Sequence, residues 1–186
     1  MTHTRGTAGS LRRHSFNLGL LRAAEAVMPP GATLDVRTMH GIPLYNADEE
    51  NAAGLPEAVT QLKDAVANAD GLLLATPEYN NGIPGVFKNT IDWLSRPASD
   101  IGRIFGNRPV AIIGTSPGNF GTLLAQNDWL PVLRTLGARP WFGGRFIAPR
   151  AQSLFDGEGR LNDAATRDRL AAFMTGFVQF IEGVNK

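Results

Sequence analysis

Hydrophobic residues along the chain follow two spacings, one typical of buried strands and the other of helices with one apolar face. The run at 71–75 is apolar throughout, which predicts a strand covered on both faces. From Phe16 to about Val27 the apolar residues recur at helical spacing, and two consecutive prolines then end the pattern. The same two spacings predict further strands at 32–36, 110–114 and 139–148, and helices at about 56–66, 84–94, 120–136 and 163–182, with a loop at 41–55.

Strands and helices therefore alternate, and this alternation predicts an α/β fold with a parallel sheet covered by helices on both faces. In such sheets a ligand binds beyond the carboxyl ends of the strands, where the direction of the connections reverses. In the five-stranded order 2-1-3-4-5, strands 1 and 3 flank this reversal. The loops at 9–15 and 76–82 then become neighbours, and the loop at 115–119 closes the far side.

Two segments fit this scheme poorly. The first strand of such a sheet should be apolar, yet the segment 2–8 contains Arg5 and Gly6. Either this strand is short and begins near Thr7, or it is poorly buried and stability is lost there. Pro131 lies inside the helix predicted at 120–136 and should kink or split it.

Composition narrows the classes of function. A chain of 186 residues with 43% hydrophobic content is long enough for one domain spanning 1–186, and its net charge of +1 favours neither nucleic acid nor an acidic partner. The absence of cysteine excludes disulfides and thiolate chemistry, so any redox reaction needs an organic cofactor. The histidines His3, His14 and His40 lack metal-ligand spacing and are expected in surface or loop positions, with no metal site. No apolar run has the length of a membrane span and no signal peptide is recognisable, so a cytoplasmic location is expected.

The first candidate site precedes the helix that begins near Phe16. Ser10, Arg12, Ser15 and Asn17 place hydroxyl, guanidinium and amide groups beside a helix N-terminus, where free N–H groups and the helix dipole favour phosphate. Ser15 could equally be only an N-cap, but that reading leaves the neighbouring residues unexplained. Neither a Walker loop nor the dinucleotide fingerprint Gly-x-Gly-x-x-Gly is present.

The second candidate site follows the apolar strand at 71–75. Pro77, Glu78, Tyr79 and Asn80 form a proline-stiffened loop with an aromatic ring, against which a planar heterocycle could stack. An ordinary surface turn is the competing interpretation. A phosphate cradle and a flat platform in one chain together indicate a mononucleotide ligand.

Less specific features remain. Gly114 to Gly118 forms a small-residue loop that would allow close approach of a ligand, although a plain turn explains it as well. Asp92, Trp93 and Trp129 could lie at an interface or substrate pocket, but aromatic residues on helices are more often simply packed. Lys88 is expected to be a solvated or helix-stabilising charge. No Ser-His-Asp or paired-carboxylate arrangement is evident.

These motifs resemble those of one family. Gly-Ser-Leu-Arg-x-x-Ser-x-Asn at 9–17, Thr-Pro-Glu-Tyr-Asn at 76–80 and Ile-Pro-Gly-Val-Phe-Lys-Asn-Thr-Ile-Asp-Trp-Leu-Ser at 83–95 are similar to sequences of the NADPH-dependent FMN reductases, closest to the bacterial quinone, azo-dye and chromate reductases. The resemblance runs nearly end to end. It departs at 2–6, in place of an apolar first strand, and at 18–19, where a basic residue is common; both put stability and cofactor occupancy in question.

The resemblance implies a flavodoxin-like three-layer sandwich that binds FMN without a covalent link. It implies an enzyme in which NADPH or NADH reduces the flavin by a ping-pong mechanism and a quinone, azo dye, chromate or free flavin takes the electrons, with no catalytic side chain. It also implies a homodimer or homotetramer, with the helix at 84–95 as a candidate surface. By this match, Ser10, Arg12, Ser15 and Asn17, with the backbone of Leu11 and Phe16, hold the phosphate, Pro77, Glu78, Tyr79 and Asn80 line the ring, and Ser116, Pro117 and Gly118 flank its other part.

Two other interpretations stay open from the sequence. One is a flavodoxin-type electron carrier that does not turn over NAD(P)H, although such carriers are strongly acidic and lack an arginine in the phosphate loop. The other is a protein of the same fold that has lost the cofactor and acts by interaction, which the polar first strand keeps possible.

Overall fold

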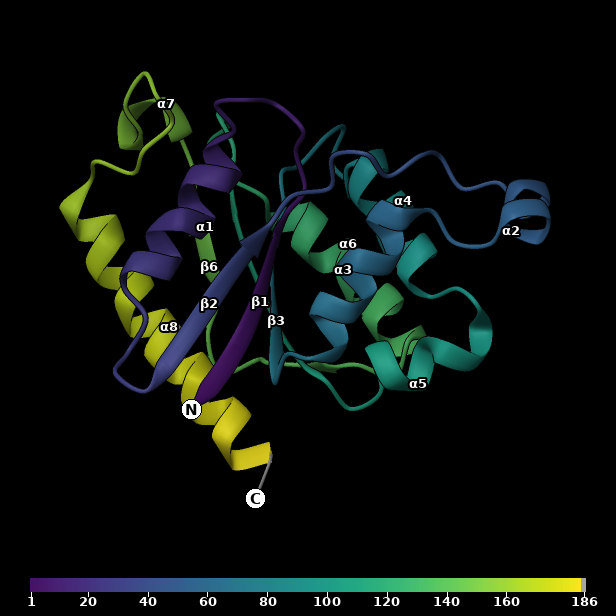
Figure 1. Ribbon diagram of the computed structural model, residues 1–186. Coiled ribbons are helices and arrows are strands. Elements are labelled where there is room, and N and C mark those ends of the chain that lie inside the picture. The colour runs from purple at the N-terminus through teal and green to yellow at the C-terminus, as the bar shows by residue number, and fades with distance from the viewer. Residues whose placement is uncertain (185–186) are drawn as a thin grey trace.

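A parallel sheet runs through the computed structural model, which describes residues 1–184. Its strand order is β2-β1-β3-β4-β5, with β6 also paired to β4, so the predicted order 2-1-3-4-5 is confirmed. Figure 1 shows β1 between β2 and β3, as the reversal of connections at β1 and β3 requires. The strands are β1 (Thr2–Ala8), β2 (Ala32–Arg37), β3 (Gly71–Ala75), β4 (Pro109–Thr115), β5 (Arg139–Pro140) and β6 (Phe146–Ala148).

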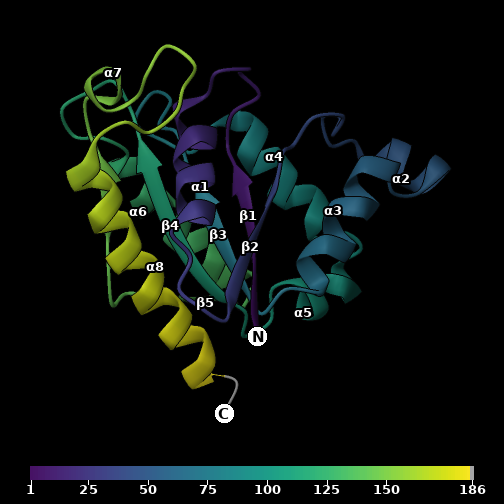
Figure 2. The same cartoon turned by 60° about the vertical axis from the view of Figure 1, so that its left-hand side comes forward.

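Helices cover both faces of this sheet, which gives the predicted three layers (Figures 1 and 2). α1 (Phe16–Ala26) and α8 (Ala164–Val184) pack on one face. The other face carries α3 (Glu57–Ala67), α4 (Gly85–Leu94), α5 (Ile101–Ile104) and α6 (Leu123–Thr135). Side chains of β3 alternate between the two layers: Leu73 joins the α1 and α8 core, whereas Leu72 and Leu74 join the other. This alternation explains why the strand is apolar at every position.

Both expectations for the first strand are wrong, because β1 is seven residues long and mostly buried. Arg5 does not break it, since its Nε donates to the Ala65 carbonyl at 3.0 Å and its guanidinium forms an ion pair with Asp35. A buried charge is tolerated when it is paired and hydrogen-bonded in this way. Gly6 has a packing role, because a Cβ there would lie 2.8 Å from Leu21 Cδ1 of α1.

The strand predicted at 139–148 is in fact two short strands. β5 pairs with the start of β4 and β6 with its end, and the chain leaves the sheet between them. Trp141 accounts for the interruption, since its ring packs against Phe173 and Phe177 of α8, with centroids 4.9 and 5.7 Å away. Burial of this large aromatic surface outweighs continuous pairing of an edge strand.

Several short helices were not predicted. The segment 41–55, expected to be a loop, contains α2 (Ala47–Ala53), which projects from the body in Figure 1. None of its residues is buried, so it has no apolar spacing to reveal it. The 3-10 helix η1 (Ala98–Asp100), α5 and α7 (Ala151–Leu154) were also missed, each being four residues or fewer.

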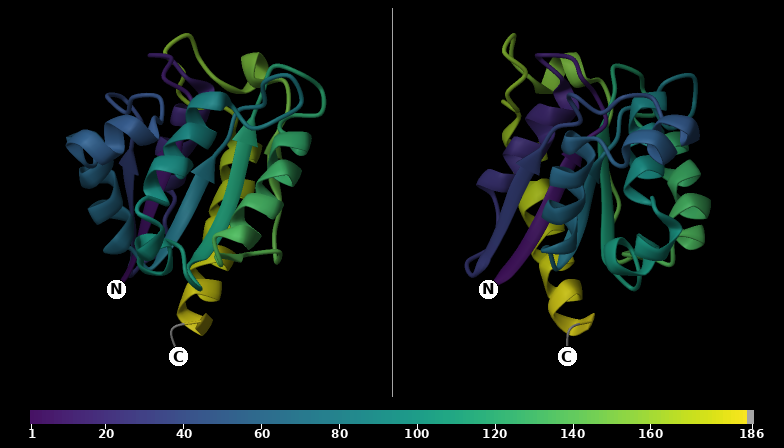
Figure 3. Two further views of the ribbon diagram at one scale, coloured as in Figure 1. Left: turned by 90° about the vertical axis from the view of Figure 1, so that its right-hand side faces the viewer. Right: turned by 45° about the vertical axis from the view of Figure 1, so that its right-hand side comes forward.

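The helix predicted at 120–136 begins three residues later and continues through Pro131, so the proline does not split it. Proline leaves the carbonyl four residues earlier without its helical donor. That carbonyl belongs to Asn127, which is exposed and can be hydrated. Figure 3 shows the loops after β1, β3 and β4 together at the end of the sheet opposite the N-terminus.

Candidate functional site

Three loops at the carboxyl ends of β1, β3 and β4 enclose a cavity of about 410 Å³. This is the place that the strand order predicts for a ligand. Ten of the thirteen site residues predicted from the sequence line it, which brings the loops at 9–15, 76–82 and 115–119 together. The lining consists of Ser10, Arg12, Ser15, Phe16, Asn17, Pro77, Glu78, Tyr79, Thr115, Ser116, Pro117 and Gln152.

One end of the cavity lies at the N-terminus of α1 and carries hydrogen-bond donors. Ser15 caps the helix, because its Oγ accepts from the Leu18 N–H at 3.3 Å, and its hydroxyl proton remains available. The Arg12 guanidinium lies 4.8 Å from the centroid of the Phe16 ring, which holds the cation near the helix start. The N–H groups of the first turn have no intrahelical acceptor. Hydroxyls, a guanidinium and a helix N-terminus together form an anion site.

Asn17 has a structural role that its sequence position does not reveal. Its side chain is only 4% exposed; Nδ2 donates to the Thr115 carbonyl at 2.8 Å and Oδ1 accepts from the Thr115 N–H at 3.0 Å. Each functional group of the side chain therefore makes one hydrogen bond to the end of β4. These bonds position the start of α1 against β4, and Asn17 also lines the cavity, where its contact with a phosphate stays a prediction.

The loop at 76–82 forms the flat side of the cavity. Tyr79 and Gly82 pair across a tight turn whose central residues Asn80 and Asn81 have φ of 50° and 64°, a conformation that asparagine tolerates. The Glu78 carboxylate accepts from the Leu124 and Ala125 N–H groups at 2.8 and 2.9 Å. It thereby caps α6 and ties this loop to the far side of the site.

Two glycines of the site loops are explained by packing. A Cβ at Gly9 would lie 2.8 Å from Pro77 Cδ and even closer to the Phe87 ring. A Cβ at Gly114 would lie 2.5 Å from the Thr76 carbonyl oxygen. Gly114 thus serves internal contact between neighbouring strands, and not the ligand approach considered from the sequence.

Three predicted site residues do not line the cavity. Leu11 is exposed, with His40 Nε2 3.2 Å from its carbonyl oxygen; Asn80 lies at the tip of the tight turn; and Gly118 accepts backbone hydrogen bonds from Gly121 and Arg150. Two lining residues were missed. Thr115 lies one residue before the predicted loop, whereas Gln152 arrives from α7, for which the sequence gives no signal.

The other charged clusters lie outside this cavity. Asp100 receives hydrogen bonds from Arg103 Nη2 at 2.9 Å and from the buried Lys63 Nζ at 2.8 Å, and these contacts lower the pKa of Asp100 from 3.8 to about 2. Lys88 pairs with Asp92 at 2.7 Å within α4, as expected of a helix-stabilising charge.

Other candidate features from the sequence have plain structural explanations. Trp93 and Trp129 are buried in the core, and the three histidines are exposed. Within residues 1–184 no group of three or more histidine, aspartate or glutamate side chains is placed to hold a metal ion. No helix in the same range is long and apolar enough to cross a membrane.

Comparison with known proteins gives consistent matches over most of the chain. The family model described as NADPH-dependent FMN reductase matches residues 6–153. An NAD(P)H-dependent FMN reductase of Pseudomonas aeruginosa is 42% identical over 163 residues, which cover 88% of this chain and 86% of the relative. A 2-hydroxy-1,4-benzoquinone reductase of a Burkholderia species is 37% identical, covering 93% and 92%, and a quinone reductase of Escherichia coli is 34% identical, covering 95% and 93%. Among solved structures, a flavoenzyme NAD(P)H:(acceptor) oxidoreductase from Paracoccus denitrificans superposes with a TM-score of 0.83 at 33% identity and covers 98% of both chains.

The cavity described above is chemically suited to FMN. Its donors Ser10, Arg12 and Ser15 gather at one end, as a terminal phosphate requires, and Pro77 and Tyr79 offer flat surfaces at the other. No lining residue is placed for a covalent link through sulfur, because the chain has no cysteine. The length of chain that matches, the fold and the hydrogen-bond donors of the cavity all indicate the same family. The chain belongs to the NADPH-dependent FMN reductase family and is a flavodoxin-like oxidoreductase that uses FMN as cofactor and NAD(P)H as electron donor.

Proposed function

We propose that this protein is a quinone reductase that works by a ping-pong mechanism, with NAD(P)H and the acceptor using the same open face of the flavin in turn. The observation that carries the proposal is the cavity itself, which has an anion site at one end and a partly open, flat end at the other. Relatives named as quinone reductases support this acceptor class. Azo dyes, chromate and free flavin are further acceptors that an open site could serve.

The residues of this chain bind and orient the cofactor. Ser10, Arg12 and Ser15, with the first N–H groups of α1, would hold the phosphate, while Asn17 keeps these groups in place from behind. The loop at 77–80 would line one side of the ring and 116–118 its other part. When bound, the flavin supplies two-electron chemistry between NAD(P)H and the acceptor.

No side chain of the cavity is proposed as an acid or base. The carboxylate of Glu78 is already occupied by two N–H groups of α6, so it is held away from general catalysis. Backbone N–H groups near 78–80 and 116–118 would instead stabilise negative charge on the reduced ring. Binding, orientation and electrostatics are therefore the whole contribution of the protein.

We also propose that the protein works as a homodimer or homotetramer, with α4 as part of the contact. Phe120, Leu124 and Tyr79 support a covered surface nearby, because these large apolar residues are 79%, 44% and 52% exposed. Sedimentation of the FMN-loaded protein tests this part separately.

The reaction is tested by the anaerobic visible spectrum of the FMN-loaded protein before and after addition of NADPH. Rapid bleaching of bound flavin, followed by reoxidation on addition of a benzoquinone, is the expected result. Steady-state plots at several quinone concentrations should then give parallel lines. Bound flavin that does not bleach would indicate an electron carrier, and a protein that binds no FMN would reject the cofactor assignment.

The phosphate assignment is tested by Arg12→Ala. Loss of a charge-assisted hydrogen bond should weaken FMN binding by about 1.5–3 kcal/mol, roughly 10- to 150-fold in Kd. Arg134→Ala is the matched control, because Arg134 is exposed on α6 outside the cavity. Equal FMN affinity of the two variants would refute the assignment of Arg12.

A further inference from the structure

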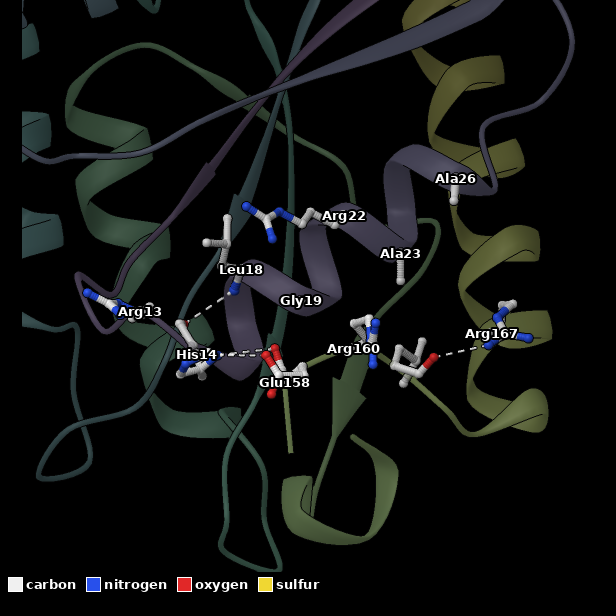
Figure 4. A pocket seen from close by; sticks show the side chains of 13 residues that line it. Arg13, His14, Leu18, Gly19, Arg22, Ala23, Ala26, Glu158, Arg160 and Arg167 are labelled. Carbon is white, nitrogen blue, oxygen red and sulfur yellow. Dashed lines mark hydrogen bonds and ion pairs between the residues drawn. The ribbon is translucent and has the colours of Figure 1, made fainter. Parts of the chain in front are cut away.

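The loop between β1 and α1, residues 9–15, carries the hydrogen-bond donors at one end of the cavity, and contacts outside the cavity hold it in place. The Ser15 N–H donates to the Arg12 carbonyl at 3.1 Å, which closes the turn before α1. On the outer side of this turn His14 Nδ1 lies 3.5 Å from the Glu158 carbonyl oxygen (Figure 4). The second half of the loop is therefore supported both from within and from the turn that contains Glu158.

The first half of the loop is held at Leu11 by a histidine that follows the neighbouring strand. Nε2 of His40 lies 3.2 Å from the Leu11 carbonyl oxygen. A carbonyl oxygen only accepts hydrogen bonds, so this ring nitrogen carries the proton and donates it. His40 is exposed and is not among the residues that line the cavity, so it reaches the loop from outside.

The position of His40 follows from the sheet and from one buried neighbour. β1 and β2 pair in parallel as far as Thr7 and Arg37, so the loops that follow these strands start side by side. Met39, only 1% exposed, anchors the turn after β2 in the core, and the Ile42 N–H donates to the Met39 carbonyl at 3.4 Å. The imidazole is thus presented to the neighbouring loop by a turn that is itself fixed.

The bond to His40 fixes the peptide group that joins Leu11 and Arg12. In a trans peptide the C=O and N–H groups point in opposite directions. Here the N–H belongs to Arg12 and donates to Ser10 Oγ at 3.3 Å. Both polar groups of this peptide are therefore engaged, the carbonyl by a residue outside the cavity and the N–H by a side chain that lines it.

This arrangement decides what the Ser10 hydroxyl can offer to a ligand. Ser10 is only 8% exposed and lines the cavity. Because its oxygen accepts the Arg12 N–H, its own proton stays available for an anion. Rotation of the peptide would turn the Leu11 carbonyl towards Ser10, and the hydroxyl proton would then be taken up by that carbonyl.

We propose that His40 is a positioning residue for the phosphate of FMN and acts through the peptide between Leu11 and Arg12. The inference rests on the proposed assignment of Ser10 and its neighbours to the phosphate. With the bond to His40 in place, the loop is ordered before FMN binds and Ser10 is set as a donor. Without this bond, part of the binding free energy is used to order the loop.

The test compares FMN with riboflavin, which is the same flavin without the phosphate. Dissociation constants are measured by titration of flavin fluorescence for the unmodified protein, His40→Ala and His40→Gln. His40→Ala should weaken FMN binding about 2- to 12-fold and leave riboflavin binding unchanged, since a net hydrogen bond of about 0.5–1.5 kcal/mol converts to this range. His40→Gln retains an N–H donor and should bind FMN like the unmodified protein.

Hydrogen exchange of the Arg12 amide, followed by NMR of the FMN-free protein, gives a second readout that needs no flavin. Exchange should be faster in His40→Ala than in the unmodified protein and should be restored in His40→Gln. His3→Ala is the matched control, because His3 is an exposed histidine near the amino end of β1 whose Nδ1 lies 2.9 Å from Thr33 Oγ1. It should change neither the flavin affinities nor this exchange rate.

An unchanged preference for FMN over riboflavin in His40→Ala would overturn the proposal, as would equal weakening of both flavins or a failure of His40→Gln to restore binding. Arg12→Ala separates this result from the phosphate assignment. If Arg12→Ala also keeps the full preference for FMN, the phosphate is bound elsewhere. If Arg12→Ala loses the preference and His40→Ala keeps it, only the role of His40 is rejected.

Discussion

Glu78 joins two sides of the site, and its removal should destabilise the fold by about 1–3 kcal/mol. Its carboxylate accepts two N–H groups at the start of α6, at 2.8 and 2.9 Å, and Thr122 at the N-cap position makes no side-chain capping bond that could replace it. Loss of an N-cap typically costs about 0.5–2 kcal/mol. The interaction of a negative charge with the helix dipole adds about 0.3–1 kcal/mol.

The assay is urea unfolding of the FMN-free protein. The free energies of unfolding of Glu78→Ala and Glu78→Gln are compared, provided that both depend equally steeply on urea concentration. Glu78→Ala should lower the urea midpoint by the amount that corresponds to about 1–3 kcal/mol in the free energy of unfolding. Glu78→Gln keeps an acceptor oxygen but removes the charge, so its free energy of unfolding should fall by less than that of Glu78→Ala. Glu25→Ala, a change of an exposed carboxylate on α1, serves as the control. If Glu78→Ala is as stable as this control, the capping argument is refuted.

Three further changes have definite expected outcomes. Gly19→Ala should destabilise the protein by about 1–3 kcal/mol, because the added Cβ clashes with the Gly159 carbonyl. The higher helix propensity of alanine alone predicts the opposite, so a stabilised variant would contradict the packing argument. Asn17→Ala leaves the Thr115 N–H and carbonyl without partners, so urea unfolding should show a loss of about 2–4 kcal/mol; a loss below about 0.5 kcal/mol would count against the positioning role. Because its cationic partners hold the folded-state pKa of Asp100 at about 2, below its ordinary 3.8, the stability from this carboxylate is complete above about pH 4 and is lost as the pH falls towards 2. Between pH 4 and pH 2, the melting temperature of Asp100→Asn should fall less steeply than that of the unmodified protein. An equal fall in both proteins would refute the pairing of Asp100 with its cationic partners.

The arrangement of the sheet could be predicted from the sequence because its signals are local. The apolar run at 71–75 and the helical spacing after Phe16 each report burial of their own segment, and the alternation of such segments constrains the order of strands. The polar first strand could not be judged in this way. Arg5 is paired with Asp35 and with the carbonyl of Ala65, and both residues are distant from it in the sequence, so no local pattern reveals these contacts.

The lining of the cavity could be predicted where the motif at 9–17 coincides with the start of α1, and less well elsewhere. Ser10, Arg12 and Ser15 lie beside the N-terminus of α1, and its position follows from sequence alone. Gln152 was missed, because its place depends on a one-turn helix that tertiary contacts position. The bonds of Asn17 to Thr115 were not predicted, because they depend on how α1 meets β4.

The divided strand beside β4 affects how this protein can meet other copies of itself. A long exposed edge strand offers a row of unpaired N–H and C=O groups to which another chain can add. Here that edge consists of two pieces, the two-residue β5, in which Pro140 has no N–H to donate, and the three-residue β6. Neither piece is long enough to template a regular intermolecular ladder. By turning Trp141 into the core, the chain also protects this side of the sheet from aggregation through strand addition.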